Sequence, residues 1–554
     1  MKKYVLALVL LTGCGSIPTS GPVISGLEIG AAEQTQVETS FPQAPRPGAS
    51  QREIVAGFLA ANASAIGDYS IAREYLADFV AGEWTPSAGL RVFETALSLK
   101  QTDQTTITAV GIPKLTLDEA LRPSLATSSS SQSVSFFLTR DNGEWRITNP
   151  PNGLLLASTV FQRNFEIANL WFVDKQRTKL VPDFIAISQR LDPATQLVRA
   201  LSNGSSSWLK PAIVNLLDPE ISGGLESVQQ IDGRVVVDFN VAVLRLSSRD
   251  QELLVSQLAQ TLQPLADVSQ LEVTVGGQLL SVSGTANPMD LATDNWPGNR
   301  TAKLTNIYAI SADNELVQPA TNLRAISWLS QFNNARNLTV AGDEQRIAVS
   351  LPSQGEIVVG YRSQRPRVIN QVAQPSDLNF DANGTLWFVN QSSRTLFGYD
   401  GNNLFPANIE IPTGSELSHA MVGPDNVRVA VISQSGSEAT LSIARLAKSD
   451  RNVALQDRLT ILTLTGRVAS LNWFSSTEVA MLVTFPNQQE PVAVLANIAT
   501  AAQTIIRLPS GANFLTANGF GALIAQDGQQ RIWLRTNSTW EQIGSGRSAT
   551  FPRE

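Results

Sequence analysis

The feature of this sequence that most constrains its fold is a unit that recurs through the C-terminal half, in which a polar turn leads directly into an alternating strand. The unit occurs as AGDEQRIAVS at 341–350, FDANGTLWFVN at 380–390, GPDNVRVAVIS at 423–433, FSSTEVAMLVT at 474–484 and AQDGQQRIWLR at 525–535. Its turn residues Asp343, Asp381, Asp425, Ser476 and Asp527 are separated by steps of 38, 44, 51 and 51 residues. Steps of this size match the span of one four-stranded blade of a β-propeller.

The recurrence predicts an all-β propeller over residues 300–554. About 255 residues, at roughly 40 to 45 per blade, correspond to about six blades, and five or seven remain alternatives. A pair of β-sandwiches would explain the strands and turns equally well but would not explain the repeat. We therefore predict a propeller of about six blades.

A first block that mixes helices with strands covers residues 50–160. Ser50 and Glu53 form a capping box, which predicts that a helix begins there. Further along, Asp141-Asn142-Gly143 stands between two strand-forming runs and indicates a hairpin. Helices followed by an antiparallel sheet predict a small α+β domain.

A second such block covers residues 161–290. Asp192-Pro193 predicts the start of one helix, and Ser248 with Gln251 forms a capping box for another. Strand formers in GRVVVDFN and LEVTVGG alternate with these helices. The whole chain is therefore predicted to be multidomain, with two α+β domains followed by the propeller.

The N-terminus has the pattern of an export signal. Met1-Lys2-Lys3 is basic, and the apolar run from Tyr4 to Leu11 is far shorter than the about 20 residues that a membrane-spanning helix needs. Leu11-Thr12-Gly13-Cys14 resembles the lipobox of bacterial lipoproteins, in which cleavage occurs just before the cysteine. The resemblance implies a signal peptide over residues 1–13 and a Cys14 that carries S-diacylglycerol and an N-acyl chain such as palmitate. A simple secretory signal with a chance cysteine, or a buried structural thiol, is the alternative.

Composition limits the remaining chemistry. Cys14 is the only cysteine and His419 the only histidine, which excludes an intramolecular disulfide and a zinc site built on several such ligands. Residues 14–49 are rich in Ser, Thr, Gly, Pro and Gln, which predicts a flexible tether from the lipidated cysteine. A net charge of -7 disfavours nucleic acid as a partner.

Together these segments resemble the LpqB family of actinobacterial lipoproteins. The likeness rests on the order of lipobox, IVAGFL, α+β block and propeller, and on LVRALSNGSSSWLKPAIVNLL, GRVVVDFN and QELLVSQLAQTL, which are similar to the GerMN domain of that family. It implies a lipid-anchored protein on the extracytoplasmic face of the cell membrane. It also implies binding to the extracellular domain of an MtrB-type sensor histidine kinase of a two-component system, with an effect on cell-envelope homeostasis and division. Only Cys14 matches a family position with a chemical role.

Two other features of the propeller region were candidates for chemistry. Asp381-Ala382-Asn383-Gly384 begins like a calcium loop, but Leu386 and Ser392 stand where an EF-hand requires Gly and Glu, so a blade turn is predicted. His419 has no second histidine or cysteine to join it, which predicts a surface or turn residue, with a pH-sensitive contact left open.

Four tryptophans, Trp328, Trp387, Trp473 and Trp533, lie in or beside the repeated strands. Packing between blades is the predicted role, because aromatic side chains fill the gaps between propeller sheets. A glycan-stacking surface is the alternative.

We thus expect a regulatory lipoprotein that is not an enzyme, with no cofactor and no metal. The alternative is a cell-wall glycan-binding or glycan-processing propeller, in which a carboxylate-based envelope hydrolase would use the propeller mouth. No phosphate loop of the G-x-x-x-x-G-K type and no G-x-S-x-G elbow occurs in the sequence.

Overall fold

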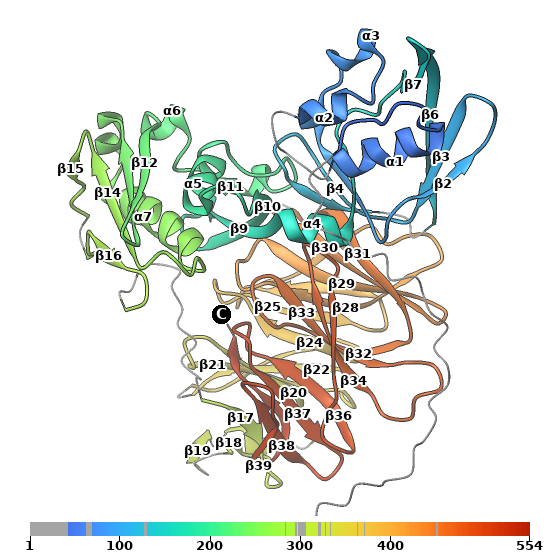
Figure 1. Cartoon of the computed structure of the whole chain (residues 1–554). Coiled ribbons are helices and arrows are strands. Elements are labelled where there is room, and N and C mark those ends of the chain that lie inside the picture. The colour runs from blue at the N-terminus through green and yellow to red at the C-terminus, as the bar shows by residue number, and fades with distance from the viewer. Residues whose placement is uncertain are drawn as a thin grey trace, which may run out of the picture.

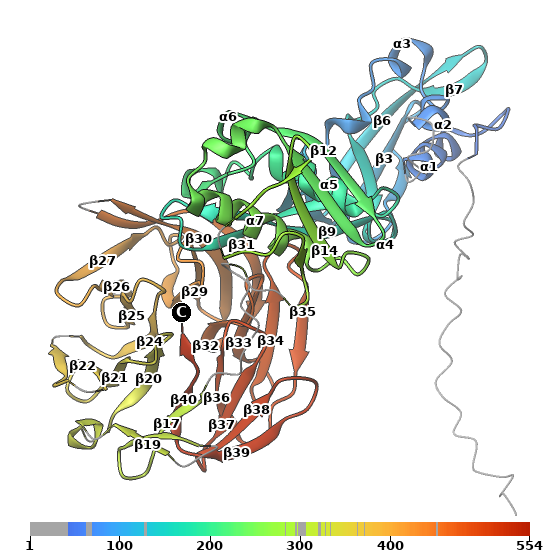
Figure 2. The same cartoon turned by 90° about the vertical axis from the view of Figure 1, so that its left-hand side faces the viewer.

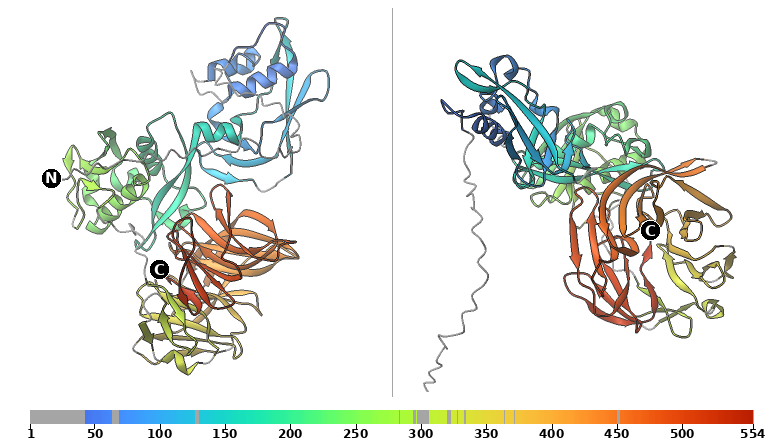
Figure 3. Two further views of the ribbon diagram at one scale, coloured as in Figure 1. Left: turned by 60° about the horizontal axis from the view of Figure 1, so that its bottom comes forward. Right: turned by 90° about the vertical axis from the view of Figure 1, so that its right-hand side faces the viewer.

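The computed structural model of the chain describes residues 43–62, 69–126, 130–282, 284–293, 296, 306–319, 323–326, 328–332, 334–362, 364–370, 372–449 and 452–553. Two smaller domains lie next to each other on one side of a large domain made of strands (Figures 1 and 3). The predicted multidomain fold, two α+β domains followed by a propeller, is confirmed. The signal peptide predicted over residues 1–13 and residues 14–42 of the predicted tether lie outside the described residues.

The N-terminal domain packs short helices against two four-stranded sheets. The capping box predicted for α1 (Gln51–Ala61) is confirmed, because the Glu53 amide donates to the Ser50 hydroxyl at 3.4 Å and the Ser50 amide donates to the Glu53 carboxylate at 2.7 Å. The hairpin predicted at 141–143 joins β6 (Gln132–Asp141) to β7 (Glu144–Ile147). The other elements are α2 (Ser70–Arg73), α3 (Asp78–Ala81), β1 (Leu90–Phe93), β2 (Ser98–Gln101), β3 (Thr106–Gly111), β4 (Pro113–Leu117), β5 (Pro123–Leu125), β8 (Leu154–Ala157) and α4 (Ser158–Asn164).

The middle domain packs α5 (Pro193–Ser202) and α7 (Ser248–Leu262) into one apolar core with its two sheets. Asp192 caps α5 as predicted, since its carboxylate accepts from the Thr195 amide at 2.6 Å. The start of α7 differs by one residue from the prediction: Ser247, not Ser248, is the N-cap, and its hydroxyl accepts from the Asp250 amide at 3.1 Å. Ser247 and Ser248 each carry a hydroxyl that could cap the helix, so the sequence pattern alone does not decide which of them is the N-cap. The strands are β9 (Phe165–Asp174), β10 (Leu180–Ser188), β11 (Ile213–Val214), β12 (Leu225–Ile231), β13 (Arg234–Phe239), β14 (Gln270–Val275), β15 (Gln278–Leu279) and β16 (Met289–Asp290).

Over the described part of residues 306–553, the strands form six blades around an axis (Figure 2). The first blade contains β17 (Tyr308–Ile310), β18 (Leu316–Gln318), β19 (Leu323–Ile326) and β40 (Arg547–Thr550), and the second β20 (Arg336–Ala341), β21 (Arg346–Leu351), β22 (Glu356–Tyr361) and β23 (Arg367–Ile369). The third contains β24 (Pro375–Phe380), β25 (Leu386–Asn390), β26 (Thr395–Tyr399) and β27 (Leu404–Ile409), and the fourth β28 (Glu416–Val422), β29 (Arg428–Ser435), β30 (Glu438–Ser449) and β31 (Asn452–Thr465). The fifth contains β32 (Arg467–Trp473), β33 (Glu478–Thr484), β34 (Val492–Asn497) and β35 (Gln503–Ile506), and the sixth β36 (Ala512–Ala517), β37 (Leu523–Asp527), β38 (Arg531–Arg535) and β39 (Glu541–Ser545).

The ring is closed by strands from both ends of the propeller. β40 pairs antiparallel with β17, so the first blade combines residues 308–326 with residues 547–550. β41 (Pro552–Arg553) then pairs in parallel with β20 of the second blade. β40 thereby covers the edge of β17 that would otherwise be unpaired.

Aspartate side chains hold four of the five recurrent turns predicted from the sequence, the exception being the turn at Ser476. Asp381 is the blade turn that was predicted: its carboxylate accepts from the Asn383 and Thr385 amides at 2.9 Å each and from the Trp387 indole at 3.0 Å. Asp343 and Asp425 accept two amide hydrogen bonds in the same way. Such short-range bonds fix a turn independently of the rest of the blade.

The fifth unit of the predicted repeat is out of step with the other four. Those four lie between the innermost strand and the second strand of a blade, whereas the turn at Asp527 joins β37 to β38. The equivalent residue of the sixth blade is Asn518, whose side chain accepts from the Phe520 and Ala522 amides at 2.8 and 3.0 Å. Asp and Asn serve the same turn chemistry at more than one corner of a blade, so the motif does not identify the corner.

Packing between blades is confirmed for three of the four tryptophans. Trp328, Trp387 and Trp473 are buried in clusters that join neighbouring blades. Trp533 is half-buried and lies outside the buried clusters, with the Arg531 guanidinium 5.8 Å from its ring, so the prediction is wrong there. It sits on β38, the third of the four strands of the sixth blade.

The fourth blade carries the other domains. β30 and β31 have 12 and 14 residues. Leu125 of the N-terminal domain and Phe184 and Trp208 of the middle domain pack against the apolar cluster of the fourth and fifth blades. The Trp208 indole also donates to the Asp457 carbonyl of β31. These contacts fix the smaller domains on the propeller.

Candidate functional site

The one site residue predicted with a chemical role, Cys14, lies outside the described residues. Its lipidation therefore stays a prediction. In the described part of the chain, no helix is both long and apolar enough to cross a bilayer.

His419 occupies the centre of the propeller rather than its surface. It lies on β28, and its side chain is 11% exposed. Nδ1 is 3.0 and 3.1 Å from the two carboxylate oxygens of Asp377 on β24, and Nε2 is 3.2 Å from the carbonyl oxygen of Val468 on β32. The prediction of a surface or turn histidine is therefore wrong. Its partner Asp377 lies 42 residues away, at a position that no local pattern marks.

The surroundings of His419 favour its protonated form. A carboxylate and a carbonyl can only accept, so each ring nitrogen must carry a hydrogen to bond to them. Burial lowers the pKa of His419, and the charge of Arg467 lowers it as well. The charge of Asp377 and the hydrogen bonds to Asp377 and Val468 raise the pKa by more than this, so it lies above 6.5. The imidazolium joins the inner strands of three successive blades.

Because His419 is protonated in the folded chain, the free energy of unfolding should depend on pH. A group whose pKa is raised by folding contributes stability fully below its unfolded pKa, about 6.5, and loses it as the pH rises through the folded pKa. We expect the urea midpoint of the native chain to fall relative to that of His419→Gln as the pH rises from about 6.5 through the folded pKa. Parallel pH curves for the two proteins would contradict the assignment. The NMR signal of this single histidine reports its pKa directly.

Arg553 reaches into the same channel from the last described strand. Its Nη2 donates to the Asn472 amide oxygen at 2.5 Å and to the Thr516 hydroxyl at 2.6 Å, on the inner strands of the fifth and sixth blades. Burial lowers the pKa of Arg553 to about 10, with Asp377 opposing the shift, so the guanidinium remains charged at neutral pH. Neither Asp377 nor Arg553 stands in a recognisable sequence motif, so neither is predicted from the sequence.

A depression of about 1030 Å³ lies over His419, where the inner strands of the third, fourth and fifth blades begin. Arg394 on its wall is paired with Glu416 at 3.2 Å. Arg467 forms no hydrogen bond or ion pair with the described residues. The remaining lining consists largely of hydroxyl, amide and small apolar side chains, with Phe485 as its aromatic residue. A lining of this kind suits a polar ligand.

The arrangement at His419 does not provide a catalytic triad. A histidine held by an aspartate activates a nucleophile through its other ring nitrogen, and here that nitrogen faces the Val468 carbonyl. Among the residues that the structure describes, no group of three or more His, Cys, Asp or Glu side chains is placed to hold a metal ion. The geometry fits a structural or binding role, and the expectation that the protein is not an enzyme stays a prediction.

The middle domain exposes a small aliphatic patch, Ile221, Val241 and Leu244. Ile221 lies on α6 (Pro219–Ser222), and Val241 and Leu244 on the adjacent 3₁₀ helix η4 (Val241–Arg245). Their side chains are 39, 64 and 58% exposed. α6 lies on the side of the middle domain that faces away from the propeller (Figure 1). Adjacent exposed aliphatic residues are a feature of protein-binding surfaces.

Three family models match the chain in succession. The model described as "Lipoprotein LpqB, N-terminal domain" matches residues 44–162, the one described as "Sporulation and spore germination" matches residues 169–281, and the one described as "Lipoprotein LpqB beta-propeller domain" matches residues 320–552. The order is that of the three structural domains.

Curated relatives agree with these matches. A protein named Lipoprotein LpqB from Cutibacterium acnes is 27% identical, over 81% of this chain and 79% of its own length. Another of that name from Thermobifida fusca is 23% identical, over 98% of this chain and 97% of its own. A solved gluconolactonase from Xanthomonas campestris aligns with a TM-score of 0.32 and 12% identity, over 45% of this chain and 87% of its own, a likeness too low to bear on activity.

Proposed function

Because the chain belongs to the LpqB family of lipoproteins, we propose that it is anchored by acylated Cys14 on the extracytoplasmic face of the cell membrane and binds a sensor histidine kinase there. The partner is the extracellular domain of an MtrB-type kinase of a two-component system. Binding modulates the kinase and through it cell-envelope homeostasis and division. The observation that carries the proposal is the match of the chain, domain by domain, to this lipoprotein family.

The aliphatic patch of the middle domain supports binding to a protein. Val241 and Leu244 are exposed to solvent on η4, which packs against α6 where Gly223 leaves room for Ala242. Burying such side chains against a partner removes apolar surface from water, at about 25 cal/mol per Å². We assign the kinase contact to this patch.

The experiment is capture of the purified kinase extracellular domain on the full chain. Leu244→Asp is expected to weaken binding roughly tenfold or more, because it removes a leucine side chain that the kinase would bury and places a charge in the interface. Leu404→Asp is the matched control, since Leu404 is a similarly exposed leucine, 44% against 58%, on the propeller. A native chain that never retains the kinase domain, or an equal loss with both variants, would count against the proposal.

Glycan binding at the depression over His419 is the second candidate function. It is favoured by the hydroxyl, amide and arginine side chains of that depression. Incubation with peptidoglycan and arabinogalactan fragments separates the two candidates. Turnover by the native chain that disappears in Glu416→Gln would establish a glycan-processing propeller instead.

A further inference from the structure

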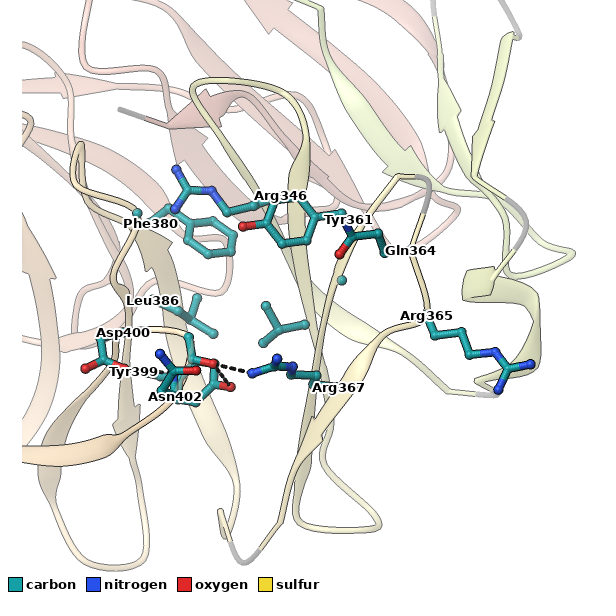
Figure 4. Close-up of a pocket in the computed structure, with 14 residues that line it drawn as sticks. Arg346, Tyr361, Gln364, Arg365, Arg367, Phe380, Leu386, Tyr399, Asp400 and Asn402 are labelled. Carbon is teal, nitrogen blue, oxygen red and sulfur yellow. Dashed lines mark hydrogen bonds between the residues drawn. The ribbon is translucent and has the colours of Figure 1, made fainter.

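A second, smaller cavity lies between the second and third blades, away from the axis. It has a volume of about 300 Å³ and is lined by residues of β22, β23 and the turns at 384 and 400–402. Figure 4 shows Arg346, Tyr361 and Phe380 on one side, Arg367, Tyr399 and Asn402 on the other, and Leu386 between them. The guanidinium groups of Arg346 and Arg367 face the cavity, against one acidic residue, Asp400, whereas the Arg365 side chain on its rim points away.

Arg367 is held in place without its charge being neutralised. One terminal nitrogen donates to the Gly401 carbonyl at 2.6 Å, and the rest of its guanidinium makes no hydrogen bond or ion pair with the described residues. Asp400 forms no ion pair with it among the described residues, and its carboxylate instead accepts from the Asn402 and Asn403 amides at 2.8 and 2.7 Å. An oriented guanidinium with free N–H groups is a receptor for a carboxylate or phosphate.

Arg346, on β21 of the same blade as Arg367, faces the cavity from its other side. Its Nε donates to Asp343 at 3.1 Å, while its terminal nitrogens make no hydrogen bond with the described residues. The guanidinium lies 5.8 Å from the Phe380 ring and occupies the space beside Gly384, where an added Cβ would come within 1.3 Å of Nη1. Gly384 therefore admits this guanidinium to the cavity wall.

The rest of the lining suits a single ring. Tyr361 and Tyr399 offer aromatic surface and Asn402 an amide for hydroxyl groups, while Phe380 and Leu386 are buried beneath the cavity wall. Aromatic faces pack against apolar ring surfaces while their edges and hydroxyl groups remain polar. We propose that this cavity binds a pyranose-sized sugar that carries one carboxylate or phosphate, with Arg367 and Arg346 receiving the anion.

The inference does not rest on the proposed kinase binding, and its test is separate. The full chain is titrated by calorimetry with glucuronate, glucose 6-phosphate, glucose and inorganic phosphate. Saturable binding of glucuronate would identify the ligand as a sugar acid. Saturable binding of glucose 6-phosphate would identify it as a sugar phosphate. In either case glucose and inorganic phosphate are expected to bind at least about tenfold more weakly, because glucose lacks the anionic group and phosphate lacks the sugar ring.

Arg367→Gln is expected to weaken binding of the sugar anion about tenfold. Arg365→Gln is the matched control: it removes the same charge from the same segment, but the Arg365 side chain points away from the cavity in Figure 4, so affinity should change less than about threefold. Gly384→Ala keeps every charge, displaces the Arg346 guanidinium and also strains the turn, because Gly384 has a φ of +81°, and it should also weaken binding.

Three results would overturn the proposal. The first is no saturable binding of either sugar anion at about 10 mM, a range in which even weak ligands register. The second is inorganic phosphate binding as tightly as glucose 6-phosphate, which would show that the ring is not recognised. The third is an equal loss in Arg367→Gln and Arg365→Gln, which would reduce the effect to overall charge.

Discussion

Replacing Arg428 with alanine is expected to lower the free energy of unfolding by about 3–5 kcal/mol. The side chains of Arg428 and Asp425 are only 2 and 3% exposed, and Nε donates to the Asp425 carboxylate at 2.5 Å. Nη2 donates to the Ser476 carbonyl of the fifth blade at 2.6 Å, and the guanidinium lies 5.1 Å from the Trp473 ring. The variant leaves a buried carboxylate without its cation and removes a bond between blades. Urea unfolding followed by tryptophan fluorescence measures the loss.

Arg346→Ala is the matched control for this prediction. Arg346 and Asp343 form the same pair, three residues apart, in the equivalent turn of the second blade, but they are 25 and 41% exposed. Water can solvate the Asp343 carboxylate after the substitution, so the expected loss is at most about 1 kcal/mol. If both variants were destabilised equally, burial would not be the cause of the effect.

Replacing Cys14 with alanine is expected to abolish partition of the protein into a detergent phase. Two or three long acyl chains on one residue hold a protein firmly, because each buried CH₂ contributes about 0.8 kcal/mol. Without the thiol no such chain can be attached, and the apolar run from Tyr4 to Leu11 is too short to span a bilayer. Detergent-phase separation followed by mass analysis of the N-terminal peptide checks both the anchor and the cleavage before residue 14.

Ser16→Ala is the control for the anchor, since it changes a neighbouring small polar residue and leaves Leu11-Thr12-Gly13-Cys14 intact. This variant should remain in the detergent phase with an acylated N-terminus. A Cys14→Ala protein that partitions like the native one, or a native N-terminal peptide without acyl groups, would contradict the lipidation.

Local chemistry is the part of this fold that the sequence predicts well. The Asp381 turn, the Ser50 capping box and the 141–143 hairpin each depend on bonds between residues at most four positions apart. Such bonds leave a readable pattern whatever the rest of the chain does. The number of blades follows from the length of the region at roughly 40 to 45 residues per blade, even though the turn at Asp527 lies at a different corner from the other four.

Contacts between distant residues explain what the sequence does not predict. His419 was expected on the surface because a lone histidine usually has no reason to be buried, and its partner Asp377 belongs to another blade. Arg553 stands in the short segment FPRE, and only closure of the ring brings it to Asn472 and Thr516. The cavity between Arg346 and Arg367 likewise exists only once two blades are adjacent.

The closure of the ring by β40 has a consequence for the order in which the chain can fold. Its pairing joins Tyr308 to Thr550, about 240 residues apart, so a chain synthesised from its N-terminus presents β17 long before its partner exists. The core of the middle domain is contiguous in sequence except for Val427, so this domain can form early. During that interval one edge of β17 is unpaired and can bind the wrong strand. The addition of β40 is therefore the step that protects this edge of the propeller from aggregation.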